Sequence, residues 1–275
     1  MTTTTESPAR PAPAAGMPDD TISVYWQTGC TSCLRTKEFL ERHGVPFRSC
    51  NVLETPEALD ELKRFGLRQV PIVVRGDAWA NGQIMRDVAK LCGIPMGEQT
   101  LLPPDELHRR LVAIIEATRA HALQMPQDAL ATHLPDRPRS HADLIYHIFN
   151  IVDAFIEHEE GQPLEYEAYY RLPPAEMQTP QGLADYGAHV RTRLDDWFAG
   201  PGADADWQAE ARVYYGQQSL HDFLERTTWH SGQHARQLVW VLERLGVTPA
   251  HPLGAETFRG LPMPEKVWDG VPNAD

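Results

Sequence analysis

The sequence predicts an α/β domain followed by an all-α domain. Its 275 residues correspond to roughly two domains at about 150 residues each. Between residues 21 and 94, β-prone stretches alternate with helical ones, which is typical of an α/β domain. Beyond residue 104, every long periodic segment has the spacing of an amphipathic helix. These three observations define the expected architecture.

The first domain is expected over residues 21–94, in the order β-α-β-α-β-β-α. Strands are predicted at 22–26, 45–52 and 70–74, with a turn at 75–77 leading into a short fourth strand near Trp79; helices are predicted at 34–43, 56–65 and 83–91. A glycine follows each helix, at positions 44, 66 and 93. Glycine is the residue that most often ends a helix, so these positions mark the helix ends.

The second domain is expected over residues 105–250, after a linker at 95–104. Helices are predicted at 105–124, 140–160, 180–198 and 219–245. Four helices of this length indicate an antiparallel four-helix bundle. Residues 1–20, rich in Thr, Pro and Ala, are expected to form a disordered tail. The C-terminal tail, residues 251–275, is expected to pack on the bundle through Trp268.

Charge and composition exclude several classes of function. The formal net charge is −13, which disfavours nucleic acid and anionic membrane surfaces as partners. The chain shows no secretory signal and no apolar run long enough for a membrane span, so a cytoplasmic location is expected. Four cysteines do not make a disulfide scaffold. A homodimer remains possible.

Two of the cysteines, Cys30 and Cys33, form a C-x-x-C pair at the start of a helix. Unpaired backbone N–H groups at a helix N-terminus favour a thiolate, so Cys30 is the expected nucleophile. Cys33 lies one turn further on and is placed to attack a mixed disulfide on Cys30. The alternative is a chance pair or half a zinc site. Cys50 and Cys92 are interpreted as small buried hydrophobic residues.

The first domain resembles the glutaredoxin family and the related redoxins that serve ribonucleotide reductase. The resemblance depends on residues 25–33 (Y-W-Q-T-G-C-T-S-C), on Val70-Pro71 and on the order of elements. It implies a thioredoxin-like fold, with Cys30 attacking, Cys33 resolving and Pro71 in cis. A thiol substrate is then expected to bind at Val70, Pro71 and Gly82.

Two positions depart from the glutaredoxin pattern. Gln27 stands where many members have Lys, and residues 81–85 (N-G-Q-I-M) lack the acidic pair that holds the amino group of glutathione. The partner of this domain is therefore not fixed as glutathione; another low-molecular-weight thiol or a thioredoxin-type reductase stays a candidate.

Three histidines form a second candidate site. His230 and His234 are four residues apart on the last bundle helix, so both project from one face, and His147 lies on the apolar face of the second bundle helix. His221 is expected on the solvent side, and His158 is too far along its helix to share an ion with His147. Hydrogen-bonded core histidines are the alternative interpretation. The residues assigned to the side opposite His230 are Glu225, Arg226, Arg236, Glu243 and Arg244.

Residues 103–246 resemble the DinB-like bundle family, which includes thiol S-transferases. The resemblance depends on residues 143–147 (D-L-I-Y-H) and 228–237 (T-W-H-S-G-Q-H-A-R-Q). It implies a divalent metal held by His147, His230 and His234. Three imidazoles suit Zn, Ni or Fe, with Zn favoured. The aromatic residues 166–170 are expected either to line the metal pocket or to cover the end of the bundle.

Three functions follow from these two sites. The leading hypothesis is a thiol-dependent enzyme that performs metal-assisted S-transfer to a small electrophile, or a thiol-assisted isomerisation. The second is a disulfide reductase that uses the bundle to dock its substrate. The third is a metal or redox sensor. The expected partners are a small-molecule thiol and an electrophile, or a protein disulfide.

Overall fold

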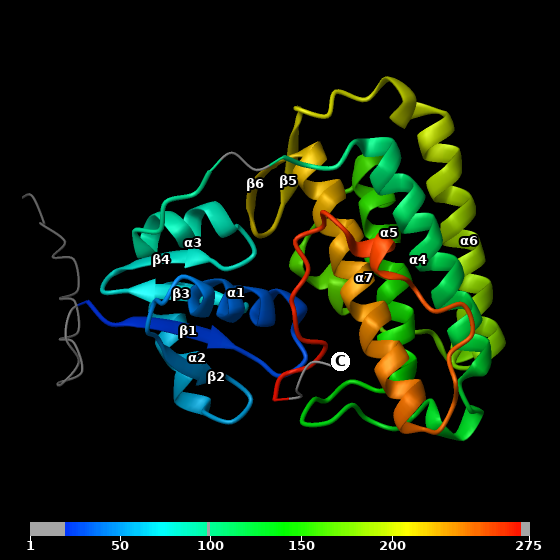
Figure 1. Cartoon of the computed structure of the whole chain (residues 1–275), viewed down its shortest axis with the longest axis horizontal. Coiled ribbons are helices and arrows are strands. Elements are labelled where there is room, and N and C mark those ends of the chain that lie inside the picture. The colour runs from blue at the N-terminus through cyan, green and yellow to red at the C-terminus, as the bar shows by residue number, and fades with distance from the viewer. Residues whose placement is uncertain (1–19, 98–99, 271–275) are drawn as a thin grey trace, which may run out of the picture.

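The chain forms two domains that lie side by side, a small α/β domain and a larger bundle of long helices (Figure 1). This computed structural model describes residues 20–97 and 100–270. The predicted fold class is confirmed. The predicted N-terminal tail, except Asp20, lies outside the described residues. So do residues 98–99 of the predicted linker and the last five residues of the predicted C-terminal tail.

The first domain is built on one mixed sheet. Its elements are β1 (Ile22–Trp26), α1 (Thr31–Arg42), β2 (Arg48–Asn51), α2 (Pro56–Lys63), β3 (Ile72–Arg75), β4 (Ala78–Asn81) and α3 (Met85–Cys92). The strand order is β2-β1-β3-β4, with β1 parallel to β2 and antiparallel to β3. The predicted order of elements therefore matches the observed one, and α1 begins three residues earlier than expected.

Alternation along the strands separates two apolar clusters. Val24 and Val73 pack under α1 and α3, whereas Tyr25 and Ile72 pack on the other face with Leu62 of α2. Successive side chains of a strand point to opposite faces, so β1 and β3 each supply both clusters. The β1–α1 connection, which carries Cys30, thus lies at the carboxyl end of the central strand β1.

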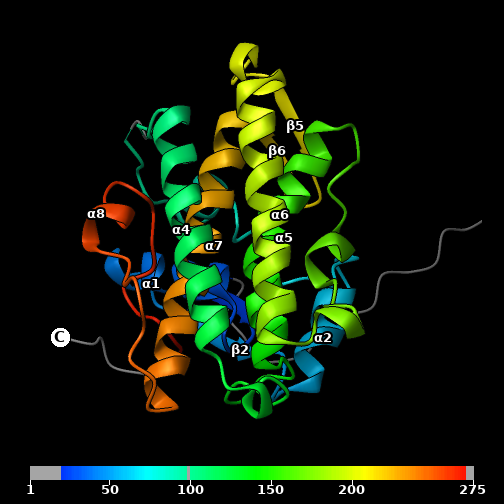
Figure 2. The same cartoon turned by 90° about the vertical axis from the view of Figure 1, so that its right-hand side faces the viewer.

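The second domain contains four long helices: α4 (Pro104–Gln124), α5 (His141–Glu159), α6 (Pro180–Ala199) and α7 (Leu220–Arg244). The helices α4 and α5 each pack against both α6 and α7, and Figure 2 shows α4 and α6 in front of α7 and α5. Within the described ranges, no helix is both long and apolar enough to cross a membrane.

The two helices that carry the histidines begin with capping boxes. Ser140 and Asp143 cap α5, and Ser219 and Asp222 cap α7, each by reciprocal hydrogen bonds between side chain and backbone. These bonds satisfy N–H groups that the helix itself leaves unpaired. The local sequence thus fixes where each histidine-bearing helix starts.

A β-hairpin before α7 was not expected from the sequence. It consists of β5 (Glu210–Val213) and β6 (Gly216–Ser219), and it reaches the first domain, where Arg86 donates to the carbonyl of Gln217 at 2.9 Å. Gly216 has a φ of +137°, which residues with a side chain rarely adopt, and a Cβ there would lie 2.4 Å from the end of the Ile84 side chain, so glycine suits this approach.

The C-terminal segment, which includes the short helix α8 (Ala255–Phe258), joins the two domains as well as covering the bundle. Trp268 is buried and stacks on Trp240 of α7. The next residue, Asp269, accepts hydrogen bonds from the backbone N–H of Gly29 (3.0 Å) and from Lys37 (2.6 Å). The end of the chain therefore holds the loop that leads into Cys30.

Candidate functional site at the domain boundary

Cys30 is the N-cap residue of α1, and its Sγ accepts a hydrogen bond from the backbone N–H of Cys33 at 3.2 Å. The two cysteines form a disulfide. Cys33 is fully buried, whereas Cys30 is partly exposed. This asymmetry suits Cys30 as the sulfur that meets a substrate and Cys33 as the sulfur that closes the internal disulfide.

The Val70-Pro71 peptide bond is cis, as the resemblance to glutaredoxins implies. Val70 lines the same pocket as Cys30. Gly82 has a different position: its N–H donates to the carbonyl of Pro71 (2.9 Å), and a Cβ there would press on Pro71 and Thr36. The residue of this turn that lines the pocket is the next one, Gln83.

The three predicted histidines lie together. One ring nitrogen from each of His147, His230 and His234 lies within 4.8 Å of the other two. All three side chains are buried, and Nδ1 of His147 and Nδ1 of His230 have no hydrogen-bond partner. A buried polar atom without a partner is costly, and a metal ion is one partner that relieves this cost.

The local environment keeps these imidazoles neutral. Burial, followed by the charge of nearby Arg139, holds the pKa of His147 and of His234 well below the usual value; burial and Arg226 do the same for the pKa of His230. Metal ions bind the neutral ring. His234 also donates from Nδ1 to Oε1 of Gln237 at 2.7 Å, which leaves Nε2 as its free ligand atom. The three residues therefore fit a divalent metal.

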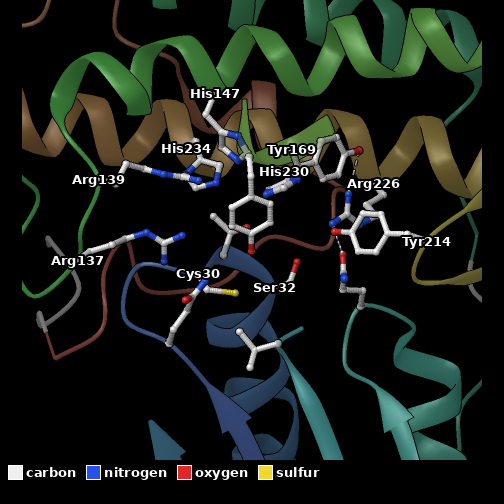
Figure 3. Close-up of a pocket in the computed structure, with 15 residues that line it drawn as sticks. Cys30, Ser32, Arg137, Arg139, His147, Tyr169, Tyr214, Arg226, His230 and His234 are labelled. Carbon is white, nitrogen blue, oxygen red and sulfur yellow. Dashed lines mark hydrogen bonds between the residues drawn. The ribbon is translucent and has the colours of Figure 1, made fainter. Parts of the chain in front are cut away.

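Cys30 and the histidine cluster line one pocket between the domains, and Figure 3 shows them facing each other across it. The centres of water-sized molecules can occupy about 50 Å³ of it, and the empty space including the mouth open to solvent is about 400 Å³. The inner part thus has room for an ion and a few water molecules. His158 and His221 lie elsewhere. His158 accepts from the backbone N–H of Arg212, and half-buried His221 bonds the carbonyl of Leu102 rather than facing solvent.

Arginines and tyrosines complete the pocket, and the arginines were missed at the sequence level. The bundle contributes Arg137, Arg139, Arg226, Tyr169, Tyr170 and Tyr214. Of the two interpretations of residues 166–170, now a short 3-10 helix, lining the pocket agrees with the structure: the Tyr169 ring lies 5.7 Å from that of His230.

Arg226 was assigned to the wrong side of its helix. It precedes His230 by four residues, so it lies one turn back on the same face. In the structure Arg226 is buried, bonds Tyr169 and Gln83, and lines the pocket with the histidines. The i, i+4 spacing was the signal that could have found it.

Comparisons with known proteins match both domains. The Glutaredoxin family model matches residues 22–79, and the DinB superfamily model matches residues 110–238. The first domain is similar to the glutaredoxin-like protein NrdH of Escherichia coli, at 38% identity over 60 residues, or 22% of this chain and 74% of that relative. The NrdH protein of Salmonella typhimurium matches to the same extent. The NrdH protein of Lactococcus lactis subsp. cremoris is 29% identical over 70 residues, or 26% of this chain and 97% of that relative.

Proposed function

Because this chain belongs to the glutaredoxin-like family through its first domain and carries a DinB superfamily domain as its second, we propose that it is a thiol enzyme with two cooperating centres. The first domain is a thiol–disulfide redox module. The second holds a divalent metal, zinc by preference, and uses a small thiol for S-transfer to an electrophile. The observation that carries this proposal is the single pocket that Cys30 shares with the histidine cluster.

In the redox step, the thiolate of Cys30 attacks one sulfur of a small disulfide and forms a mixed disulfide, and the other half leaves as a thiolate. The thiolate of Cys33 then attacks Cys30 Sγ, which forms the internal disulfide and releases the second thiolate. Two electrons pass from the cysteine pair to the substrate. The products are two molecules of free thiol, set free beside the histidines.

His147, His230 and His234 would hold the metal, and Gln237 would orient His234. When bound, a divalent ion there supplies a Lewis acid that stabilises a thiolate. In the transfer, the thiol sulfur bonds to the electrophilic carbon, the bond to the leaving group breaks with its electron pair, and the thiol proton passes to solvent. Tyr169, which is buried, and Tyr214, which is half-buried, would keep bulk water from this site.

The test separates the two centres by substitution. We expect about one metal ion per wild-type chain, measured by mass spectrometry on untagged protein, and loss of that ion from a His230→Ala/His234→Ala double variant. His234→Ala should lose transfer of 3-mercaptopropionate to an activated aryl halide and keep its reduction of hydroxyethyl disulfide. Cys30→Ser should lose reduction of hydroxyethyl disulfide and keep the transfer reaction, provided that the thiol is supplied already reduced.

The control is His189→Ala, because His189 is an exposed histidine on α6. It should bind metal and transfer thiol as the wild type does. Failure to retain any of Zn, Ni or Fe after reconstitution, or full transfer activity in His234→Ala, would reject the metal centre. The chain would then be a disulfide reductase with a docking bundle, or a sensor if it turned over no thiol substrate.

A further inference from the structure

We propose that Arg137, Arg139 and Arg226 form an anion-binding subsite, and that the disulfide reduced by Cys30 belongs to a small thiol carrying carboxylates. The proposal deepens the proposed function and rests on it only in taking Cys30 as the attacking thiol. The recognition of charge comes from the bundle, while the reacting sulfur comes from the redox domain.

The positive charge in the pocket is only partly compensated. Three guanidinium groups line it, and none of the described residues that line it is acidic. Asp143 acts on Arg139 and Asp269 acts on Arg137, but Asp143 lines an adjoining pocket and caps α5, and Asp269 pairs with Lys37. Cationic groups that have too little counter-charge in a partly buried space are unfavourable unless an anion joins them. The composition of the pocket thus selects a negatively charged ligand.

Arg226 is built into the site. Its side chain is 5% exposed, and its Nε is buried without a hydrogen-bond partner. Its other nitrogens donate to Tyr169 and Gln83, and its guanidinium lies 5.3 Å from the ring centre of Tyr169 and 4.4 Å from that of Tyr215. These contacts hold the group in place before any ligand arrives.

Arg137 and Arg139 approach the pocket from the other side of the histidines (Figure 3). Arg137 donates to the carbonyl of Thr28, next to the loop that leads into Cys30. The guanidinium of Arg139 makes no hydrogen bond or ion pair with any part of the chain that the structure describes, and it faces the pocket. Burial lowers the pKa of Arg139 to about 9, so the group stays cationic at neutral pH.

The redox domain offers no charge of its own here. The side chains that it contributes around Cys30 are neutral: Gln27, Thr31, Ser32, Val70 and Gln83. Guanidinium groups bind carboxylates strongly and in pairs of hydrogen bonds. A disulfide with a carboxylate at each end would therefore place its sulfurs near Cys30 while the arginines hold its ends. The narrow space excludes the bulk of a folded protein.

The test uses the protein as purified and three disulfides of similar size and different charge. They are dithiodipropionate (two negative charges), hydroxyethyl disulfide (neutral) and cystamine (two positive charges). Pre-reduced protein supplies the two electrons in a single turnover, and mass spectrometry follows formation of the Cys30–Cys33 disulfide. We expect the dianion to react at least about tenfold faster than the dication, with the preference falling as salt is added.

Substitution then assigns the preference. Arg139→Gln should slow the dianion about tenfold and leave the neutral disulfide within about twofold, whereas Arg109→Gln, at an exposed arginine of α4, should change neither. Calorimetry with suberate, an unreactive dicarboxylate of matching length, gives a second readout. Suberate should bind the wild type and bind Arg139→Gln and Arg226→Lys more weakly.

Two results would overturn the inference: equal rates for the three disulfides, or an Arg139→Gln variant that slows all three alike. Both leave the proposed redox function standing, because the cysteine pair still reacts. If no disulfide oxidises the pair at all, the proposed function fails instead, and suberate binding still decides whether the anion subsite exists.

Discussion

Gln237 connects the histidine cluster to the end of the chain. Its Oε1 accepts from His234, and its Nε2 donates to the carbonyl of Val267 at 3.2 Å. An outer partner of this kind fixes the tautomer and the ring orientation of a metal-binding histidine. Gln237 is therefore expected to position His234 for the proposed metal ion without being a ligand itself.

Replacing Gln237 with Leu keeps the volume and removes the acceptor. We expect the affinity for zinc, measured by competition with a chelating dye, to fall about 10- to 100-fold. The far-ultraviolet circular dichroism spectrum should stay that of the wild type. Gln217→Leu, on the exposed hairpin strand, is the control. Unchanged affinity in Gln237→Leu would show that His234 needs no outer partner.

At this scale the sequence was most informative where chemistry and spacing agree. Cys30, Cys33 and the three histidines could be named because C-x-x-C and i, i+4 spacing are local patterns. Arg137 and Arg139 could not, since they lie in a loop, and only the tertiary fold turns that loop toward the pocket. Gly82 was expected to bind the thiol substrate; its N–H bonds the carbonyl of Pro71, and its neighbour Gln83 lines the pocket.

The helix α7 carries two of the three histidines, and its first turn is held by the capping box of Ser219 and Asp222. Loss of an N-cap hydroxyl costs about 1 kcal/mol. We expect Ser219→Ala to lower the free energy of unfolding by about that amount in urea titration, and Ser219→Asp to restore most of it. Because the cap lies about three turns from His230, metal affinity should hardly change; a large loss would mean that the helix start positions the ligands.

The elements that the sequence predicted well are those whose signals are internal. The four long helices have apolar periodicity, caps and breakers of their own, and their observed bounds differ by a residue or so from the expected ones. The signals of the β5–β6 hairpin are much weaker: E-A-R-V alternates over only four residues, and G-Q-Q-S has no apolar residue. Its partners are Ile84 and Arg86 of the other domain, so its structure depends on a contact that no local pattern contains.

At the scale of the whole molecule, the contact between the two domains contains a buried carboxyl group. Glu225 of α7 is 6% exposed, and burial raises its pKa to about 7, although Arg35 of the first domain opposes the shift. In the unfolded chain the pKa of this carboxyl is near its ordinary value of 4.5. The folded state thus binds the proton more tightly, so its stability falls as the pH rises from about 4.5 to about 7.

Replacing Glu225 with Gln removes this dependence. At pH 8 we expect Glu225→Gln to be more stable than the wild type by up to about 3 kcal/mol, and at pH 4 the two should be equal. Thermal unfolding at a series of pH values measures the difference. Glu243→Gln, at an exposed position of the same helix, should gain nothing, and a gain for Glu225→Gln that is the same at every pH would contradict the argument.

The placement of the two domains was beyond the sequence, because each domain's pattern describes its own core. The residues that set the placement are polar: Glu38 accepts from the backbone of Glu265 and Lys266, and Arg137 donates to Thr28. Their partners lie more than 100 residues away in the chain. From the sequence alone, polar residues of this kind are assigned to the solvent-exposed surface, because their partners in the other domain are not known.

The hydrogen bond from Gly29 to Asp269 spans 240 residues of sequence, and on the ribosome this separation is also an interval of time. At roughly 5–20 residues per second, about 12–48 s pass between synthesis of the two partners. The glutaredoxin-like domain is synthesised long before the bundle that forms the other side of its pocket. We therefore expect Cys30 of an incomplete chain to be open to disulfides that the folded pocket would exclude, until the bundle and the segment around Asp269 have been synthesised.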